Sequence, residues 1–278
     1  MSKRDDLFGD KMSEVILEVK GISKSFAIKG NSILRKVDRL VVSDLDFNLT
    51  RGSAVAIVGE SGCGKTTTAR VIMGLEKPNS GQILWKGKEL FFPHDVASRK
   101  DRAKKMQMVF QNPFSSLTPT LPINKALEEI VKFHQQEEDL NPKEYVHSLL
   151  EQVGLSKKEG ERLPKQLSGG QCQRAAIARA LAAKPELIIL DEAVSALDVS
   201  TQAQILNLIE SLRVSLGISL LFITHDLAVV RQTCDSVIVM NNGALVETGM
   251  TFKILSNPTN PYTRKLLGAV PRGIKNES

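Results

Sequence analysis

Apolar and polar side chains alternate in two segments near the beginning of the chain, residues 16–26 and 45–49. Alternation with a period of two is typical of strands that bury one face, so we predict an antiparallel strand in each segment. The intervening residues 27–43 are polar and basic, which predicts an exposed loop or a loose hairpin. Residues 76–90 predict a turn that leads into a further strand. These segments together predict a β-rich lobe.

The pattern changes to helical spacing over about residues 112–170. One helix is predicted over residues 123–138, and a second runs from Pro142 to Gly154. Asn141 and Pro142 have the residue types preferred at a helix cap and in a first turn, and Gly154 is typical of a helix end.

Strand and helix patterns alternate again in the last part of the chain. Residues 187–190 and 219–224 are continuous apolar runs, and a helix is predicted between them over about residues 201–216. Apolar strands separated by helices predict a parallel sheet that is covered on both faces. The asparagine-glycine pair at residues 242–243 predicts a hairpin turn between the last two strands.

The composition adds limits to this picture. With 278 residues, of which 42% are hydrophobic and 24% charged, the chain can bury a substantial core. We expect one catalytic core with an inserted subdomain. The net charge of +6 permits an anionic partner, but lysine and arginine are scattered along the sequence, so binding to nucleic acid is not expected.

Cysteine usage and hydropathy point to the cytoplasm. The three cysteines are widely separated and form no C-x-x-C pair, so neither a disulfide framework nor a zinc site is expected. The charged N-terminus lacks an apolar signal region, and the longest apolar stretch, around residues 216–224, is too short to span a bilayer. We expect a chain that does not cross the membrane and has solvated tails at residues 1–13 and 272–278.

The strongest chemical signal is the segment GESGCGKTT, which follows an apolar strand and precedes a helix pattern. It fits the spacing G-x-x-x-x-G-K-[ST] of a phosphate-binding loop. Backbone N–H groups of such a loop surround phosphate oxygens, while the lysine adds a mobile charge and the threonine hydroxyl can bind Mg²⁺. A chance glycine-rich turn is the alternative, but the flanking strand and helix favour nucleotide binding. The residues of this loop are Gly59, Glu60, Ser61, Gly62, Cys63, Gly64, Lys65, Thr66 and Thr67, and Cys63 is expected to contribute its backbone.

Two carboxylates follow the apolar run that begins at residue 187. Asp191 is expected to orient the ligands of Mg²⁺ at the C-terminal edge of the strand, and Glu192 to face the attacking water. A charged turn after a strand is the alternative, which would be favoured if no phosphate loop lay upstream. The two motifs together predict nucleotide hydrolysis.

The segment LSGGQ at residues 167–171 opens a second helix that can bind an anion at its N-terminus. Ser168 is expected to cap this helix, and the two glycines leave backbone N–H groups accessible. One ATP has a single γ-phosphate, which Lys65 already contacts. A second receptor is redundant within one chain, so we predict that it serves the nucleotide of another copy or of a sister chain.

In the order of these motifs, and over nearly its whole length, the sequence resembles the ATP-binding subunits of ABC transporters. The resemblance implies that Phe26 stacks on adenine, that Gln111 links the core to a helical subdomain, and that His225 holds the γ-phosphate and Glu192. The alternatives are that Phe26 is a core aromatic, Gln111 an ordinary polar residue at a domain boundary, and His225 a core histidine. The implied residues are Glu192 and His225 for catalysis; Phe26 and Gln111, with the phosphate loop, for ATP; Thr66, Gln111 and Asp191 for the metal; Ser168, Gly169, Gly170 and Gln171 for a signature acting in trans; and Ser195, Ala196, Leu197 and Asp198 for the D-loop.

The implied fold class is α/β, a P-loop NTPase core of ABC type with an antiparallel β lobe and an inserted helical subdomain. The cofactors implied are ATP and Mg²⁺. We expect four parts of the chain. Residues 14–111 form a first core segment with the phosphate loop, and residues 112–178 a helical subdomain that ends in the signature helix. Residues 179–250 form a second core segment with the carboxylates and the histidine, and residues 251–278 a C-terminal helix or tail.

The last residues narrow the resemblance to one branch of the family. Residues 257–272 are similar to the NPxHPYT tail of importer ATPases for oligopeptides, dipeptides and nickel, with Asn260 in place of the histidine. Many relatives continue into a cysteine-bearing extension that can hold an iron–sulfur cluster. Because no cysteine follows Cys234, we expect no cluster. An ABC exporter ATPase, a soluble ABC ATPase acting on nucleic acid or ribosomes, and a regulatory module without turnover are the alternatives.

The resemblance also implies the assembly, at the cytoplasmic face of the cell membrane. The expected partners are a second ABC ATPase subunit, two membrane permease subunits and, indirectly, an extracytoplasmic solute-binding protein. A heterodimer of ATPases is favoured, and a homodimer is possible. The permease is expected to contact residues 112–122 near Gln111, with Phe114 and Leu117 on the contact surface. The histidines expected at the surface are His94, His134 and His147.

Overall fold

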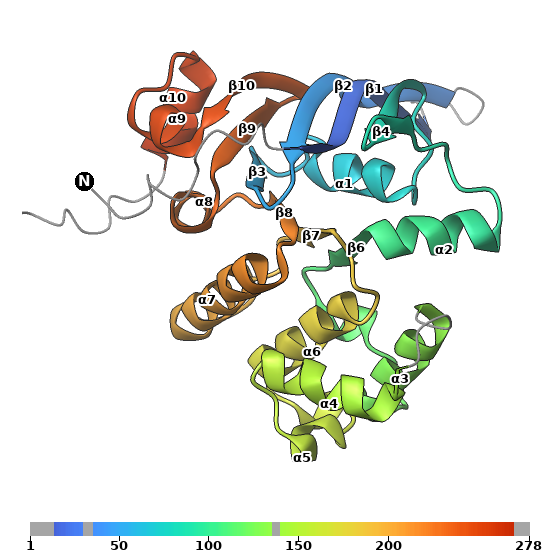
Figure 1. Cartoon of the computed structure of the whole chain (residues 1–278). Helices are drawn as coiled ribbons and strands as arrows, with labels where there is room; N and C mark the ends of the chain where they lie inside the picture. The colour runs from blue at the N-terminus through green and yellow to red at the C-terminus, as the bar shows by residue number, and fades with distance from the viewer. Residues whose placement is uncertain (1–13, 30–35, 135–139, 270–278) are drawn as a thin grey trace, which may run out of the picture.

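The computed structural model of the chain describes residues 14–29, 36–134 and 140–269. The tails predicted at residues 1–13 and 272–278 lie outside these ranges. Within them the chain forms two sheets and a group of helices, which Figure 1 shows below the sheets.

The first sheet is antiparallel, with the strand order β2-β1-β4-β5. Its strands are β1 (Val15–Lys29), β2 (Lys36–Thr50), β4 (Ser80–Trp85) and β5 (Lys88–Glu89). Most of residues 27–43, which were predicted as a loop or loose hairpin, lie in β1 and β2. Of these two alternatives the hairpin is confirmed for the described residues, because the main chains of β1 and β2 pair antiparallel along them, for example at Ala27 and Asp38.

The second sheet has six strands in the order β10-β9-β3-β8-β7-β6. Its strands are β3 (Ala54–Val58), β6 (Met106–Val109), β7 (Leu187–Asp191), β8 (Ser219–Ile223), β9 (Ser236–Asn241) and β10 (Ala244–Met250). All neighbours are parallel except β9 and β10. The predicted turn at Asn242 and Gly243 joins this last pair, with φ values of 46° and 85° that suit asparagine and glycine.

Helices cover both faces of the second sheet. They include α1 (Lys65–Met73), α6 (Gly169–Leu181), α7 (Val199–Leu216) and α8 (Leu227–Thr233). Along β3, Ala54, Ala56 and Val58 belong to the core shared with α6, α7 and α8. The intervening Val55 and Ile57 belong to the core shared with α1 and the antiparallel sheet. The continuous apolar character of β3 therefore follows from burial on both sides, as predicted.

The helical group has its own caps. Its members are η1 (Pro113–Ser116), α3 (Ile123–His134), α4 (Pro142–Gln152), α5 (Lys157–Gly160), η2 (Pro164–Gln166) and α6. The side chain of Asn141 accepts a hydrogen bond from the N–H of Lys143 at 3.1 Å, and Gly154 has a φ of 70° just beyond α4. The cap and the end predicted for this helix are confirmed.

Three short helices complete the described fold: α2 (Val96–Lys105), α9 (Thr251–Ser256) and α10 (Pro261–Gly268). The sequence did not predict α2, which is rich in lysine and arginine and has no apolar stripe. The side chain of Asp95 caps it, and the buried Arg102 fixes it to the core by donating hydrogen bonds to three backbone carbonyls. None of the helices in the described part of the chain is long and apolar enough to cross a membrane.

Two residues expected at the surface are buried. His134 is 8% exposed, because helical spacing places it on the same face of α3 as Leu127 and Val131. Leu117, which follows η1, is 5% exposed and belongs to the core shared with α6. His94 is exposed and His147 is half-buried.

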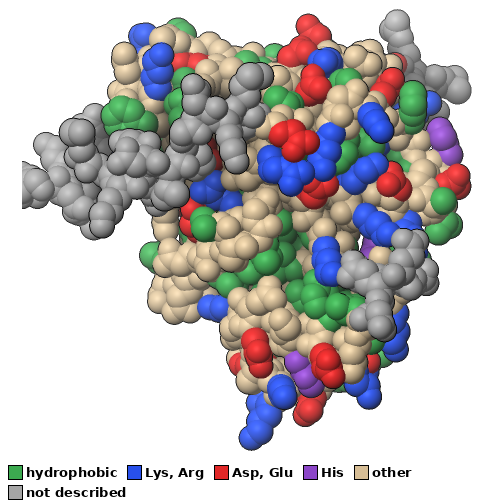
Figure 2. All heavy atoms as spheres, in the orientation of Figure 1, with side chains coloured by type: hydrophobic (Ala, Val, Ile, Leu, Met, Phe, Trp, Pro, Cys, Tyr) green, Lys and Arg blue, Asp and Glu red, His purple; other side chains and the backbone are tan. Residues whose placement is uncertain are grey.

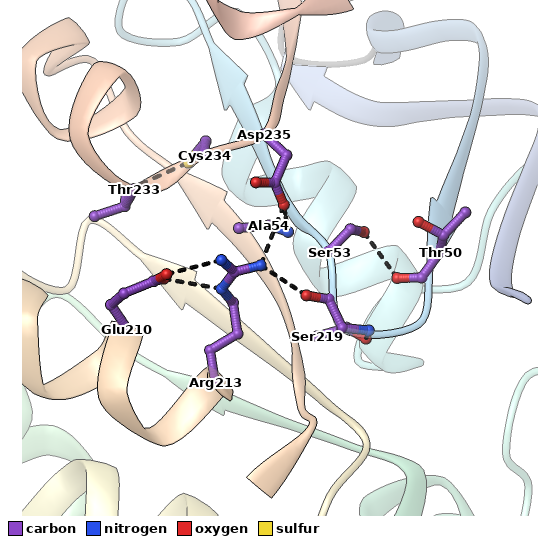
Figure 3. A network of polar contacts seen from close by, with 10 residues as sticks. Thr50, Ser53, Ala54, Glu210, Arg213, Ser219, Thr233, Cys234 and Asp235 are labelled. Carbon is purple, nitrogen blue, oxygen red and sulfur yellow. Dashed lines mark hydrogen bonds and ion pairs between the residues drawn. The ribbon is translucent and has the colours of Figure 1, made fainter. Parts of the chain in front are cut away.

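A polar network fixes the end of the second sheet where its strands begin (Figure 3). Arg213 of α7 donates to the carbonyl oxygen of Gly52 at 2.7 Å and to Asp235 at 3.2 Å, and Glu210 holds the same guanidinium at 2.8 Å. Asp235 also accepts from the N–H of Ala54 at 2.8 Å. These bonds tie the starts of β3 and β9 to α7. The opposite ends of the strands carry the loops that form the candidate site.

Candidate functional site

The phosphate loop connects the buried end of β3 to the N-terminus of α1. Gly62 and Gly64 have φ values of 80° and 104°, in the left-handed region that glycine adopts without strain. The Nζ atom of the buried Lys65 donates to the carbonyl oxygens of Gly59 at 2.8 Å and of Glu60 at 2.9 Å. Its ammonium group therefore points into the loop beside a helix N-terminus, where both charges favour an anion.

Backbone segments of β2 and of the β9–β10 turn pack against this loop. A Cβ atom added to Gly64 would lie 2.4 Å from the carbonyl oxygen of Val41 in β2. The N–H of Gly243, in the β9–β10 turn, donates to the carbonyl oxygen of Cys63 at 3.1 Å. Burial raises the pKa of the Cys63 thiol, whose Sγ lies 3.9 Å from Nζ of Lys65.

The loop also meets a buried carboxylate from the second sheet. Asp191 ends β7, which is separated from β3 by β8 alone. The hydroxyl of Thr66 donates to Oδ1 of Asp191 at 3.0 Å. Burial raises the pKa of Asp191, and the Thr66 hydrogen bond acts in the opposite direction. A cation beside these two oxygens would stabilise the ionised carboxylate, and hard oxygen ligands are those that Mg²⁺ prefers.

Glu192 follows Asp191 in a strained backbone conformation. Its φ is 48°, a region that costs a residue other than glycine on the order of 1–3 kcal/mol. Its N–H donates to the carbonyl oxygen of Ile223 at 2.8 Å, and its Oε1 lies 3.2 Å from Nδ1 of His225. Strands β3, β7 and β8 therefore bring the phosphate loop, the two carboxylates and His225 to one edge of the sheet. This is the edge at which parallel α/β sheets bind ligands.

Gln111 and the D-loop lie next to this pair. Nε2 of Gln111, just beyond β6, donates to the hydroxyl of Ser195 at 3.4 Å, and that hydroxyl donates to the carbonyl oxygen of Glu192 at 2.9 Å. Asp198 caps α7 by accepting from the N–H of Thr201 at 2.9 Å. The D-loop is thus held between Glu192 and the start of α7.

The signature segment has different neighbours. Ser168 caps α6, with its hydroxyl accepting from the N–H of Gln171 at 3.3 Å and its own N–H donating to the Gln171 side chain at 2.9 Å. A Cβ atom added to Gly170 would lie 2.7 Å from Cγ2 of Thr201. These contacts place the signature against the start of α7, not against the phosphate loop.

Phe26 lies on the antiparallel sheet near the loop. It pairs with Arg39 of β2, two residues before Val41, whose carbonyl oxygen faces Gly64. The ring is half-buried, and the ammonium group of Lys24 lies 4.8 Å from its centroid. An aromatic ring at this position can stack on a base.

One residue that contacts the loop was missed by the sequence analysis. The hydroxyl of Tyr262, in α10, accepts a hydrogen bond from the N–H of Glu60 at 3.2 Å across 202 residues of sequence. Asn260 and Pro261 are typical of a helix start, and they signal α10 itself. Nothing in the local spacing signals the contact with the phosphate loop.

Known proteins are similar to this chain in sequence. The family model described as ABC transporter matches residues 42–195. The oligopeptide transport ATP-binding protein AppF of Bacillus subtilis is 44% identical, with 93% of this chain and 79% of AppF covered. The dipeptide transport ATP-binding protein DppF of Haemophilus influenzae is 42% identical, with 94% of this chain and 80% of DppF covered.

A solved structure matches most of the chain. It is a dimeric ATP-binding cassette in a post-hydrolysis state, bound to ADP and Pi, with a TM-score of 0.74 and 28% identity over 85% of this chain and 99% of the cassette. The predicted α/β fold class, a P-loop core of ABC type with an antiparallel lobe and a helical subdomain, is confirmed. The chain belongs to the ABC transporter family, as an ATP-binding subunit that hydrolyses ATP.

Proposed function

We propose that this chain powers the import of oligopeptides or dipeptides from the cytoplasmic face of a membrane transporter. AppF and DppF, which are named for peptide transport, match it over most of their length. The tail at residues 257–272 belongs to the same importer branch by resemblance. The tail alone also allows nickel, and the two relatives favour peptides.

Within the site, the loop from Gly59 to Thr67 holds the phosphates of ATP, with Lys65 as the mobile charge. Thr66 and Asp191 would hold Mg²⁺, and the side-chain amide of Gln111 would be a further ligand. When bound, Mg²⁺ neutralises phosphate charge and aligns the γ-phosphate for attack.

Catalysis is assigned to the pair of Glu192 and His225. Glu192 accepts a proton from the attacking water, and His225 orients Glu192 and contacts the γ-phosphate. The 3.2 Å contact between these two side chains is the main observation that supports the proposal. It lies at the same end of the sheet as the 3.0 Å contact of Thr66 with Asp191, so the catalytic pair lies beside the expected metal ligands.

Two chains are needed to complete a site. The signature at Ser168 and the phosphate loop are both suited to a γ-phosphate, and in this chain the signature packs on α7 instead. A second ATPase subunit arranged head to tail would place its signature over the ATP held by Lys65. We propose a heterodimer with a related gene product, which closes around two ATP and opens after hydrolysis.

The permease is proposed to contact the surface beside Gln111. Phe114 in η1 is 45% exposed, although apolar, and it lies just beyond the strand that leads to Gln111. Leu117 is buried and is not part of this surface. Figure 2 shows lysine and arginine mixed with acidic side chains on the face it draws, which supports a protein partner over nucleic acid.

Co-purification with the two permeases tests this proposal. Phe114→Asp should abolish co-purification from membranes and remove stimulation of ATP turnover by the permeases, while basal turnover stays unchanged. Phe252→Asp is the matched control, because Phe252 in α9 is also exposed, at 84%, and α9 packs beside β10, away from the helical group (Figure 1). If wild type never co-purifies and its turnover ignores every membrane component, the importer proposal is wrong.

A further inference from the structure

One peptide group of the phosphate loop is held from both sides. The carbonyl oxygen of Gly59 accepts from Nζ of Lys65 at 2.8 Å, and the N–H of Glu60 donates to the hydroxyl of Tyr262 at 3.2 Å. Both atoms belong to the same planar peptide unit. Rotation of this plane would therefore break the two hydrogen bonds together.

Tyr262 is itself fixed by its own helix start. The side chain of Asn260 accepts from the N–H of Tyr262 at 2.8 Å and donates to the carbonyl oxygen of Val246 at 3.1 Å. The carboxylate of Glu247, in β10, accepts from the N–H and the hydroxyl of Thr259, both at 2.7 Å. The start of α10 is thus bound to β10, which gives the Tyr262 hydroxyl a defined position.

The ring of Tyr262 adds to this rigidity. It is half-buried and packs on the core that lies under α9 and α10, together with Val246, Leu255 and Leu266. A hydroxyl on a packed ring loses little rotational freedom when it accepts a hydrogen bond. Its effect on the phosphate loop is therefore one of orientation, at low entropic cost.

We propose that Tyr262 is a positioning residue for ATP binding. Its hydroxyl fixes the plane of the Gly59–Glu60 peptide, and the carbonyl side of that plane sets the position from which Lys65 reaches the phosphates. The hydrogen bond of the hydroxyl goes to the phosphate loop and not to Glu192 or His225, so it acts on binding and not on the chemical step. The C-terminal segment of the chain is thereby a part of the nucleotide site.

Tyr262→Phe tests this role, since it removes the hydroxyl and keeps the ring. We expect the Kd for ATP and the KM for ATP to rise about 3- to 10-fold, the effect of losing one neutral hydrogen bond. The value of kcat should stay within about a factor of two of wild type, because equal loss of ground-state and transition-state binding changes KM alone. A variant with unchanged KM, or with kcat reduced as much as kcat/KM, overturns the proposal.

The chain offers a matched control, because its other tyrosine, Tyr145, lies in α4 of the helical group. Tyr145→Phe should leave the Kd and KM for ATP unchanged. The isolated chain suffices for the Kd, and the assembled pair of ATPase subunits for KM and kcat. Neither measurement needs peptide or permease, so a failure of the peptide-import proposal would not affect them. An equal rise in KM for both variants would show a general effect of hydroxyl removal and would overturn the assignment.

A second measurement keeps the test independent of the folding of Tyr262→Phe. Wild-type chain labelled with 3-fluorotyrosine has two fluorine signals, since the sequence has two tyrosines, and the spectrum of Tyr145→Phe assigns them. Titration with ADP and with ATP should shift the Tyr262 signal and leave the Tyr145 signal in place. A Tyr262 signal that does not move at saturating nucleotide contradicts the proposal.

Discussion

The link between α10 and β10 depends on the charge of one carboxylate, and its loss should destabilise the protein. Glu247 is 8% exposed and accepts hydrogen bonds from the N–H and hydroxyl of Thr259 at 2.7 Å and from the N–H of Asn260 at 3.2 Å. In Glu247→Gln, the side-chain oxygen can still accept from Thr259. The new NH₂ group would face the N–H of Asn260, where two donors meet and no hydrogen bond forms.

The expected effect follows from these contacts. Hydrogen bonds to a charged group contribute about 1.5–3 kcal/mol each, and only part of this is lost in Glu247→Gln. We expect the free energy of unfolding at pH 7 to fall by about 1.5–3 kcal/mol. This is at the upper end of what single substitutions usually cost.

The pH dependence gives a second, sharper expectation. Burial alone would raise the pKa of Glu247, but the hydroxyl of Thr263, followed by the hydrogen bonds from Thr259 and Asn260, lowers it from 4.5 to about 2. A lowered pKa in the folded state stabilises the protein above pH 4.5 and loses this contribution as pH falls from 4.5 towards 2. The difference between wild type and Glu247→Gln should therefore be full at pH 7 and shrink steadily below pH 4.5.

Urea unfolding of both proteins from pH 7 down to pH 3, followed by circular dichroism, measures this difference. Glu89→Gln is the control, because Glu89 is an exposed carboxylate on β5, and it should change the free energy of unfolding by less than about 0.5 kcal/mol. A Glu247→Gln variant as stable as the control at pH 7, or a difference independent of pH, would refute the reasoning.

Four further substitutions test the site. Lys65→Ala should weaken nucleotide binding and turnover together, as measured by equilibrium binding and phosphate release. Glu192→Gln should bind ATP like wild type and hydrolyse it about 10²- to 10⁴-fold more slowly, because an amide cannot take the proton of the attacking water. Ser168→Arg should leave ATP binding to the isolated chain intact and block ATP-driven dimerisation, as measured by light scattering. Loss of ATP binding to the isolated chain would mean that the signature contacts the nucleotide of its own chain. Gly64→Ala should lower the free energy of unfolding by about 1–3 kcal/mol in urea titrations, since its φ is 104° and its Cβ would meet the backbone of β2.

The local structure of the site could be predicted from the sequence. The phosphate loop, the carboxylates after residue 190 and the cap at Ser168 each depend on residues close together in the chain, and each local motif folds as expected. The parallel strands were also predictable, because burial on both faces requires continuous apolar runs such as that of β7. Domain limits at residues 111, 178 and 250 stay predictions.

The errors arise where contacts between distant segments decide the structure. The pairing of β1 with β2 extends to Lys29 and Lys36, farther than the alternation of apolar and polar side chains indicates. The basic helix α2 depends on Arg102, whose burial is decided by carbonyl groups of other elements. His134 is buried because it lies on the inward face of α3, and Leu117 is buried because it packs in the core shared with α6. The contact of Tyr262 with Glu60 forms because α10 is bound to β10, which places it beside the phosphate loop in the folded chain.

Transport driven by this chain is the central claim, and peptide uptake into proteoliposomes tests it most directly. The vesicles hold the two permeases, this chain and its partner ATPase, with the solute-binding protein and labelled peptide outside and ATP inside. Wild-type chain should accumulate peptide only when ATP and Mg²⁺ are present, and Glu192→Gln should bind ATP and accumulate almost none. Hydrolysis by the wild-type assembly without any peptide uptake, or uptake by Glu192→Gln at the wild-type rate, would contradict the account.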